Sequence, residues 1–363
     1  AGEDITSGTG GVFVGYQAGL QATTSNYPIA IGYEAIGTGG MTGTDNTAIG
    51  RQAGNDLTSG TYNNFMGYQA GFNATTVNNT VAIGKKAIGL GVLTGTDNIA
   101  IGNSAGLDLT SGYMNIFMGY YAGSSATTGI DNVMIGRSAG YNATTATNTV
   151  AIGRSAIGSG VLTGTDNTAI GYQAGRTLTS GTYNFFGGYR AGYNATTADN
   201  TVAIGRNAIG LGVLTGDNNT AIGYQAGYDL TSGAYNVAIG YRAGYEITTG
   251  ADNTILGPSA GDALVDGSNN IIIGHDAAAS ATDASNEITM GDTNVTKFRV
   301  PGLNFIIKDS TATEDYVLTV DANGEAGWEA AGGGGGADLY AANEDSPAAQ
   351  PSATGANAIA IGD

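Results

Sequence analysis

A glycine recurs every 17 or 18 residues along most of the chain, and this repeat constrains the fold more than any other feature. Each marker glycine follows three mostly apolar residues and precedes two variable residues and an alanine, as in Val81-Ala82-Ile83-Gly84-Lys85-Lys86-Ala87. The marker glycines are Gly15, Gly32, Gly50, Gly67, Gly84, Gly102, Gly119, Gly136, Gly153, Gly171, Gly188, Gly205, Gly223, Gly240, Gly257, Gly274 and Gly291. Self-similarity at a fixed period indicates one structural unit that stacks on copies of itself.

The length and composition of the unit predict its secondary structure. Glycine accounts for 63 of the 363 residues, and glycine opposes helix formation. The apolar segments are three to five residues long and lie between Gly, Asn, Asp, Thr and Ser, which is typical of short strands joined by turns. We therefore predict an all-β fold, a parallel β-solenoid or β-roll of about 17 coils with a 17–18-residue period, over residues 1–291.

The period fades after residue 291, and the remaining chain divides by composition. Residues 292–330 are predicted to form a small β connector, with Trp328 in its core. Residues 331–354 are a Gly-rich and polar linker, and residues 355–363 start a second repeat region. We expect the chain to be a segment of a longer protein, because it opens and closes within a repeat unit. The predicted connector strands are Phe298 to Val300, Leu303 to Lys308 and Tyr316 to Val320.

Both faces of the repeated strand are apolar. The residue before the marker glycine is Ile, Val, Met or Leu in 16 of 17 units, and we assign it to the core of the coil. The preceding residue must face the other way and is also apolar, so we expect other copies of the chain to cover it, most simply in a parallel homotrimer. A monomeric solenoid with a flat Ala-rich face is the alternative. The predicted interface residues are Phe13, Phe65, Ala82, Phe117, Met134, Phe186, Ile255 and Ile272.

The residue after the marker glycine is Tyr in eight units and Arg or Lys in five. In-register stacking would place these side chains about 5 Å apart, which suits ring stacking and cation–π contact. We interpret them as a structural ladder at a subunit boundary, and a glycan-binding aromatic strip is the alternative. The predicted members are Tyr16, Tyr68, Tyr120, Tyr172, Tyr224 and Tyr241, and His275 joins the same surface. Asn stands four residues before the marker in 11 units and is predicted to form a hydrogen-bonded stack.

Composition argues against several functions. The formal net charge is −18, whereas a nucleic-acid-binding protein needs a positively charged surface. The chain has no Cys, which excludes disulfides and thiolate chemistry. A single His argues against a His-based triad, and no apolar run is long enough to span a membrane. Asp residues before the strands fit Asx turns. We therefore expect no enzymatic activity, no cofactor, no metal, no nucleic acid and no membrane insertion, leaving open an ion on a trimer axis.

The pattern Asn79-Thr80-Val81-Ala82-Ile83-Gly84 resembles the head repeat of YadA-like trimeric adhesins, and Asn357-Ala358-Ile359-Ala360-Ile361-Gly362 resembles the same motif. This resemblance implies a left-handed parallel β-roll with three chains side by side. The segments 295–305 and 317–328 resemble connector modules of bacteriophage tail fibres of the marine and cyanobacterial type.

Together these features predict the structural shaft of a viral tail fibre involved in host attachment. The expected partners are further copies of the chain, other fibre or tail proteins, and the host cell surface through a distal tip outside this segment. The expected location is the virion tail fibre. The alternatives are the head of a bacterial trimeric adhesin at the cell surface, a homopolymeric extracellular filament, and an ice-binding solenoid, which would need a flat Thr face.

Overall fold

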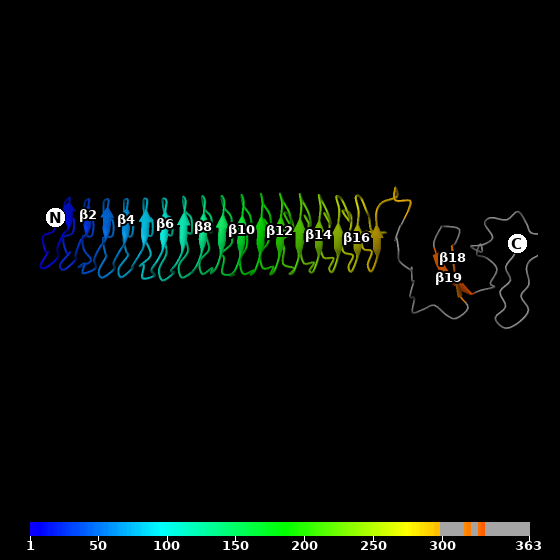
Figure 1. Ribbon diagram of the computed structural model, residues 1–363, viewed down its shortest axis with the longest axis horizontal. Helices are drawn as coiled ribbons and strands as arrows, with labels where there is room; N and C mark the ends of the chain where they lie inside the picture. Colours follow the sequence, from blue (N-terminus) through cyan, green and yellow to red (C-terminus); the bar gives the residue numbers. More distant parts are fainter. Residues whose placement is uncertain (298–315, 321–325, 331–363) are drawn as a thin grey trace, which may run out of the picture. The chain divides into compact units, whose positions relative to one another are not determined.

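The structure is a computed structural model that describes residues 1–297, 316–320 and 326–330. The chain divides into two units, of which the first is Ala1–Thr296. This first unit is a parallel β-solenoid of seventeen successive coils, each contributing one three-residue strand (Figure 1). The described residues contain no helix, so the predicted all-β solenoid with a 17–18-residue period is confirmed.

The strands of the solenoid follow one another in chain order. They are β1 (Val12–Val14), β2 (Ile29–Ile31), β3 (Thr47–Ile49), β4 (Asn64–Met66), β5 (Val81–Ile83), β6 (Ile99–Ile101), β7 (Ile116–Met118), β8 (Val133–Ile135), β9 (Val150–Ile152), β10 (Thr168–Ile170), β11 (Phe185–Gly187), β12 (Val202–Ile204), β13 (Thr220–Ile222), β14 (Val237–Ile239), β15 (Thr254–Leu256), β16 (Ile271–Ile273) and β17 (Ile288–Met290). In the following text, a coil carries the number of its strand.

Each strand pairs in parallel with the strand of the next coil, with middle residue opposite middle residue. Phe65 of β4 lies opposite Ala82 of β5, which in turn lies opposite Ala100 of β6. The same register holds from β1 to β17, so every repeat position forms a row along the solenoid (Figure 1). A property of one repeat position therefore becomes a property of a whole surface.

The marker glycine ends each strand and allows close stacking of the coils. Gly119 has φ +136°, a conformation that residues with a side chain rarely adopt. A Cβ atom there would lie 2.6 Å from the carbonyl oxygen of Gly136 in the next coil. Both the backbone angle and the contact between coils therefore require glycine, which explains why this residue carries the period.

The middle residue of the strand points into the coil, and the residue before the marker glycine points outward. Ala82 is completely buried, whereas Ile83 is only half-buried and Met66 is 36% exposed. This reverses the orientation predicted from the sequence. The alanine three residues after the marker, such as Ala87, is also completely buried and, with turn residues such as Leu93, fills the narrow interior. The middle position therefore usually takes Ala, and the larger aliphatic side chain faces outward.

A phenylalanine fits the middle position where the facing turns lack side chains. A Cβ atom on Gly106 or Gly123 would come within 2.8 Å or 2.5 Å of the Phe117 ring. Both glycines lie four residues after a marker and have φ near +56°. Where the strand carries Ala82, the equivalent turn position holds the buried Ile88 instead. Large side chains thus alternate between strand and turn, which keeps the interior filled without overlap.

The predicted asparagine stack is confirmed as an internal ladder. Asn115 is completely buried, and its Nδ2 donates to Oδ1 of Asn98 at 3.1 Å and to the carbonyl oxygen of Gly129 at 2.8 Å. Its Oδ1 accepts from the backbone N and from Nδ2 of Asn132, at 3.1 Å and 3.0 Å. Thr149 ends this run of asparagines. Its backbone N donates to Oδ1 of Asn132, but its hydroxyl donates to the carbonyl oxygen of Thr147 within its own turn. Each amide thereby ties consecutive coils together.

The described part of the second unit is one hairpin. The strands β18 (Tyr316–Val320) and β19 (Ala326–Ala330) pair antiparallel, with Leu318 opposite Trp328. The predicted strand at 316–320 is thus confirmed, whereas those at 298–300 and 303–308, the linker 331–354 and the repeat at 355–363 lie outside the described residues. In the part of the chain that is described, no helix is long and apolar enough to cross a membrane.

Candidate functional site: the outer sheet face and its two edges

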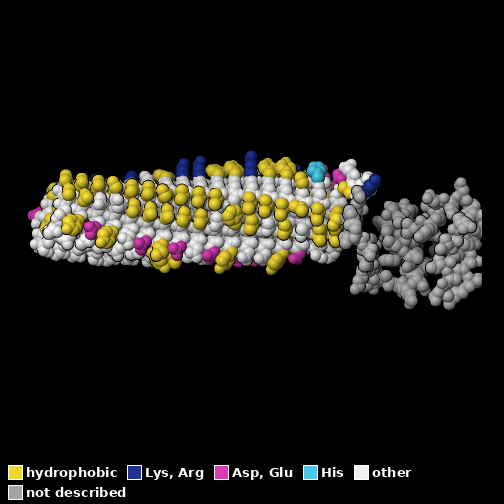
Figure 2. Space-filling model, in the orientation of Figure 1, with side chains coloured by type: hydrophobic (Ala, Val, Ile, Leu, Met, Phe, Trp, Pro, Cys, Tyr) yellow, Lys and Arg dark blue, Asp and Glu magenta, His cyan; other side chains and the backbone are white. Residues whose placement is uncertain are grey.

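The outer face of the sheet carries two rows of mostly aliphatic side chains, which Thr interrupts in four strands, Asn64 in one and Gly187 in another. One row is the first residue of each strand and the other is the third, the residue before the marker glycine (Figure 2). Ile204 is 38% exposed, Ile170 42% and Leu256 46%. Because consecutive strands are in register, these side chains form one mostly apolar surface along the solenoid, which we call the outer face.

The residue after each marker glycine forms the Tyr/Arg row, which borders the outer face beyond the strand ends. The ring centroids of Tyr172 and Tyr189 are 5.1 Å apart, and those of Tyr224 and Tyr241 are 5.2 Å apart. The guanidinium carbon of Arg206 lies between these pairs, 5.5 Å from the Tyr189 centroid and 5.8 Å from the Tyr224 centroid. Coils 10 to 14 therefore share one uninterrupted stack.

A second stack covers coils 1 to 4. Tyr16 stacks on Tyr33 with the centroids 5.3 Å apart, and Arg51 lies 5.6 Å from Tyr33 and 5.7 Å from Tyr68. In coil 7, Tyr120 contacts Arg137 at 5.7 Å. All six predicted ladder tyrosines thus make a stacking or cation–π contact with the neighbouring coil, namely Tyr16, Tyr68, Tyr120, Tyr172, Tyr224 and Tyr241.

The stacking favours the structural interpretation of this row over a glycan-binding strip. A sugar ring binds against the face of an aromatic ring, and within each stack neighbouring coils cover those faces. Tyr224 has Arg206 on one side and Tyr241 on the other. Its exposed fraction of 37% therefore belongs largely to the ring edge and the hydroxyl group. Such a row presents polar edges and positive charge to its surroundings.

A row on the opposite border of the outer face was not recognised from the sequence as one surface. It consists of the residue five positions before each marker glycine, and we call it the Asp/Tyr row. All its members from coil 2 onward have φ between +52° and +64°. Its tyrosines are 60–63% exposed, and it also contains Asn residues and Met114. Its Asp and Tyr members are Tyr27, Asp45, Tyr62, Asp97, Asp131, Asp166, Tyr183, Tyr235 and Asp252.

The predicted interface residues lie inside the coils. Phe65, Ala82, Phe117, Met134, Phe186, Ile255 and Ile272 are completely buried in a single chain, and Phe13 in the first coil is partly buried against the same core. These side chains leave no surface for a partner, so their assignment to a contact between chains is wrong. The error follows from the reversed strand orientation, because the residues on either side of them form the outer face.

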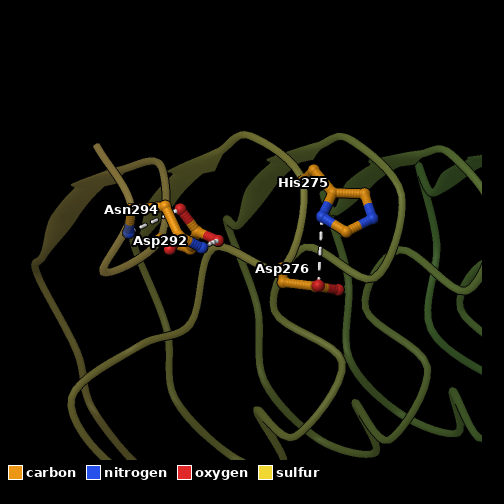
Figure 3. A network of polar contacts seen from close by, with 4 residues as sticks. All are labelled: His275, Asp276, Asp292 and Asn294. Carbon is orange, nitrogen blue, oxygen red and sulfur yellow. Dashed lines mark hydrogen bonds and ion pairs between the residues drawn. The ribbon is translucent and has the colours of Figure 1, made fainter.

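His275 continues the Tyr/Arg row at coil 16. Its Nδ1 lies 3.0 Å from Oδ2 of Asp276, and the two side chains are 71% and 54% exposed (Figure 3). In the next coil, Nδ2 and the backbone N of Asn294 donate to the carboxylate of Asp292 at 2.7 Å and 3.0 Å. These hydrogen bonds lower the pKa of Asp292. The group is an open, solvated surface cluster, and an exposed ion pair of this kind contributes little to stability.

Within the described residues, no three His, Cys, Asp or Glu side chains are grouped in a way that could hold a metal ion. Comparison with models of protein families, with curated proteins and with solved structures finds no match to this chain. The function therefore has to be inferred from the surfaces described above, of which the outer face is the largest.

Proposed function

We propose that the solenoid is a structural shaft that associates with other copies of itself through the outer face. The observation that carries this proposal is the pair of mostly aliphatic rows that lies exposed along the solenoid (Figure 2). Exposed apolar patches larger than a few hundred Å² on a soluble protein mark interaction sites. The regular coils supply a stiff, repetitive scaffold that suits a spacer.

The dimensions of the outer face suit a stable interface. With a strand spacing of about 4.8 Å, sixteen intervals give a shaft of roughly 75–80 Å, and three residues span about 10 Å. The product is roughly 800 Å², close to the area that each partner contributes to a standard protein–protein interface. A second copy offers a face of matching length and apolar character.

We assign the shaft to a viral tail fibre that takes part in host attachment. The support is the resemblance of the repeat and connector to such fibres, together with the self-associating rod. Three parallel copies would then form the shaft, other fibre or tail proteins would join it, and a distal tip would contact the host. A bacterial surface adhesin or an extracellular filament would use the same shaft. An ice-binding role is not favoured, because only Thr47, Thr168, Thr220 and Thr254 occupy the first row of the outer face.

Matched triple substitutions test self-association. One variant carries Val81→Asp, Val150→Asp and Val202→Asp in the first row of the outer face. The control carries Val92→Asp, Val161→Asp and Val213→Asp. These three valines lie in the same coils, are 55–57% exposed, and belong to the returning turns, the segments that lead from one marker glycine to the next strand. Both variants add three negative charges, and they differ only in the side of the coil that is changed.

Sedimentation velocity of the full chain measures the outcome. We expect the unchanged chain and the control to sediment as one oligomer, and the outer-face variant to dissociate. Burying each Val contributes about 1 kcal/mol or more, and each buried carboxylate adds a desolvation cost. A monomeric unchanged chain, or equal dissociation of both variants, would contradict self-association through the outer face.

A further inference from the structure

The charged residues of the solenoid are segregated across its width. All nine Lys and Arg residues between residues 1 and 291 lie within five positions after a marker glycine. Five of them belong to the Tyr/Arg row, whereas five Asp residues belong to the Asp/Tyr row on the other border of the outer face. Figure 2 shows Lys and Arg along one edge and most Asp and Glu along the other, with the aliphatic rows between them. The basic residues are Arg51, Lys85, Lys86, Arg137, Arg154, Arg176, Arg190, Arg206 and Arg242.

Because of this segregation, charge determines whether a second copy on the outer face runs in the same direction or in the opposite direction. When two copies face each other and run in the same direction, a rotation about the shaft axis relates them. That rotation brings the Tyr/Arg row of each copy against the Asp/Tyr row of the other. When the copies run in opposite directions, each row instead meets its own counterpart, so Arg faces Arg and Asp faces Asp. Complementary charge favours the first arrangement, and like charges penalise the second.

The pairing of residue types within single coils supports the same orientation. In a parallel arrangement without axial shift, residues of one coil lie at one height, so the two rows meet coil by coil. Two of the five coils with Asp in the Asp/Tyr row carry Arg in the Tyr/Arg row: coil 3 has Asp45 and Arg51, and coil 8 has Asp131 and Arg137. All four side chains are exposed. The four coils with Tyr in the Asp/Tyr row also have Tyr in the Tyr/Arg row, namely Tyr27 with Tyr33, Tyr62 with Tyr68, Tyr183 with Tyr189 and Tyr235 with Tyr241.

We propose that copies of this chain associate in parallel, with the Tyr/Arg row of each copy against the Asp/Tyr row of its neighbour. This inference rests on the proposed self-association through the outer face, and it adds which rows meet at the borders and a reason in charge for the parallel direction. It applies equally to a closed ring of two or of three copies, since both bring unlike rows together. The stacking of the Tyr/Arg row along the shaft holds its cations at the border, where the neighbour's carboxylates approach.

Distances between spin labels decide the direction of the copies. The chain has no Cys, so Ser59→Cys in coil 3 or Ser159→Cys in coil 9 gives a single labelling site, and both serines are exposed on the returning turns. Parallel copies keep equivalent coils at the same height, so the two labels should report similar distances between copies. Antiparallel copies would place coil 3 against coil 15, which separates the Ser59 labels by on the order of 60 Å along the shaft but leaves the Ser159 labels level.

Charge reversal tests the contact between the borders. Arg51→Asp with Arg137→Asp, or Asp45→Arg with Asp131→Arg, should each weaken association at low ionic strength by about tenfold or more. The variant that combines all four substitutions should recover most of that loss, because it exchanges the two borders. Sedimentation equilibrium of the full chain measures the dissociation constant for all three variants, and salt should reduce the differences.

The outcomes separate this inference from the proposed function. A monomeric chain would overturn both. An oligomer with a Ser59 separation near 60 Å, or with no recovery in the combined variant, would overturn the parallel arrangement while leaving self-association intact. Similar label distances together with recovery support the arrangement proposed.

Discussion

The fit of Phe117 between two turn glycines makes a quantitative prediction. Gly123 and Gly227 occupy the same repeat position, four residues after a marker, and both have φ +56°. A Cβ atom on Gly123 would lie 2.5–2.8 Å from three atoms of the Phe117 ring. A Cβ atom on Gly227 would have its nearest neighbours at 3.6 Å and 3.7 Å, which is ordinary contact. Gly123→Ala and Gly227→Ala therefore share the backbone strain and differ in the overlap.

The expected magnitudes follow from these two contributions. The left-handed conformation costs an alanine roughly 1–2 kcal/mol in either variant. Overpacking against the ring adds about 1–3 kcal/mol in Gly123→Ala alone. Phe117→Ala by itself should cost about 3–5 kcal/mol through the cavity it leaves. In the double variant Phe117→Ala with Gly123→Ala, the Gly123 substitution should destabilise the coils no more than Gly227→Ala does, because the overlapping ring is gone.

Hydrogen exchange is the suitable assay, because repeat proteins open locally and a single global midpoint hides the change. Amides of coils 6 to 8 in Gly123→Ala should exchange roughly 5- to 150-fold faster than the matching coils of Gly227→Ala. The double variant should show a coupling of the same size between Phe117 and Gly123. Equal acceleration in both alanine variants, or additivity in the double variant, would refute the packing argument.

Four further outcomes are expected. Asn115→Ala should lower the free energy of local opening in coils 6 to 8 by about 2–4 kcal/mol and so accelerate hydrogen exchange there, because it leaves buried partners of the Asn115 amide unpaired. Exchange no faster than in the unchanged chain would count against the asparagine ladder. Phe117→Asp should unfold the neighbouring coils, because Phe117 is completely buried within one chain. A variant that is fully folded by circular dichroism but dissociated in sedimentation would contradict the place of Phe117 in the core. Burial raises the pKa of Asp229, with Glu246 adding to the effect, so its charged form destabilises the fold at neutral pH. Asp229→Asn should therefore increase the protection of coils 12 to 14 against hydrogen exchange there, a gain that shrinks as the pH falls through the raised pKa. Hydrogen bonds from Thr249 and Thr248 lower the pKa of Asp266, so its stabilisation is present above the ordinary value of 3.8 and is lost as the pH falls. Asp266→Asn should therefore decrease the protection of coils 14 to 16 against hydrogen exchange at pH 7, and changes of equal sign in the Asp229 and Asp266 variants would refute this assignment.

Much of the fold could be predicted from the sequence because the repeat leaves few choices. Seventeen marker glycines, each requiring a positive φ, set the coils and their stacking, and the buried asparagines were recognisable from their fixed spacing. The Tyr/Arg row was predicted as a ladder for the same reason, since in-register coils bring equal positions together. The Asp/Tyr row had an equally constant spacing of five residues before the glycine, and that spacing could have identified it.

The period, the strand position within each unit and the rows that parallel stacking must produce all follow from the order of residues along the chain. That order did not determine which strand face is enclosed, because hydrophobicity alone assigns Ile and Val inward and Ala outward. The enclosed face depends on the folded coil, because a coil with one three-residue strand has an interior too narrow for a large side chain in every unit. Ala therefore fills the inside, Phe enters only opposite glycine turns, and the aliphatic rows are left on the outer face between borders of opposite charge.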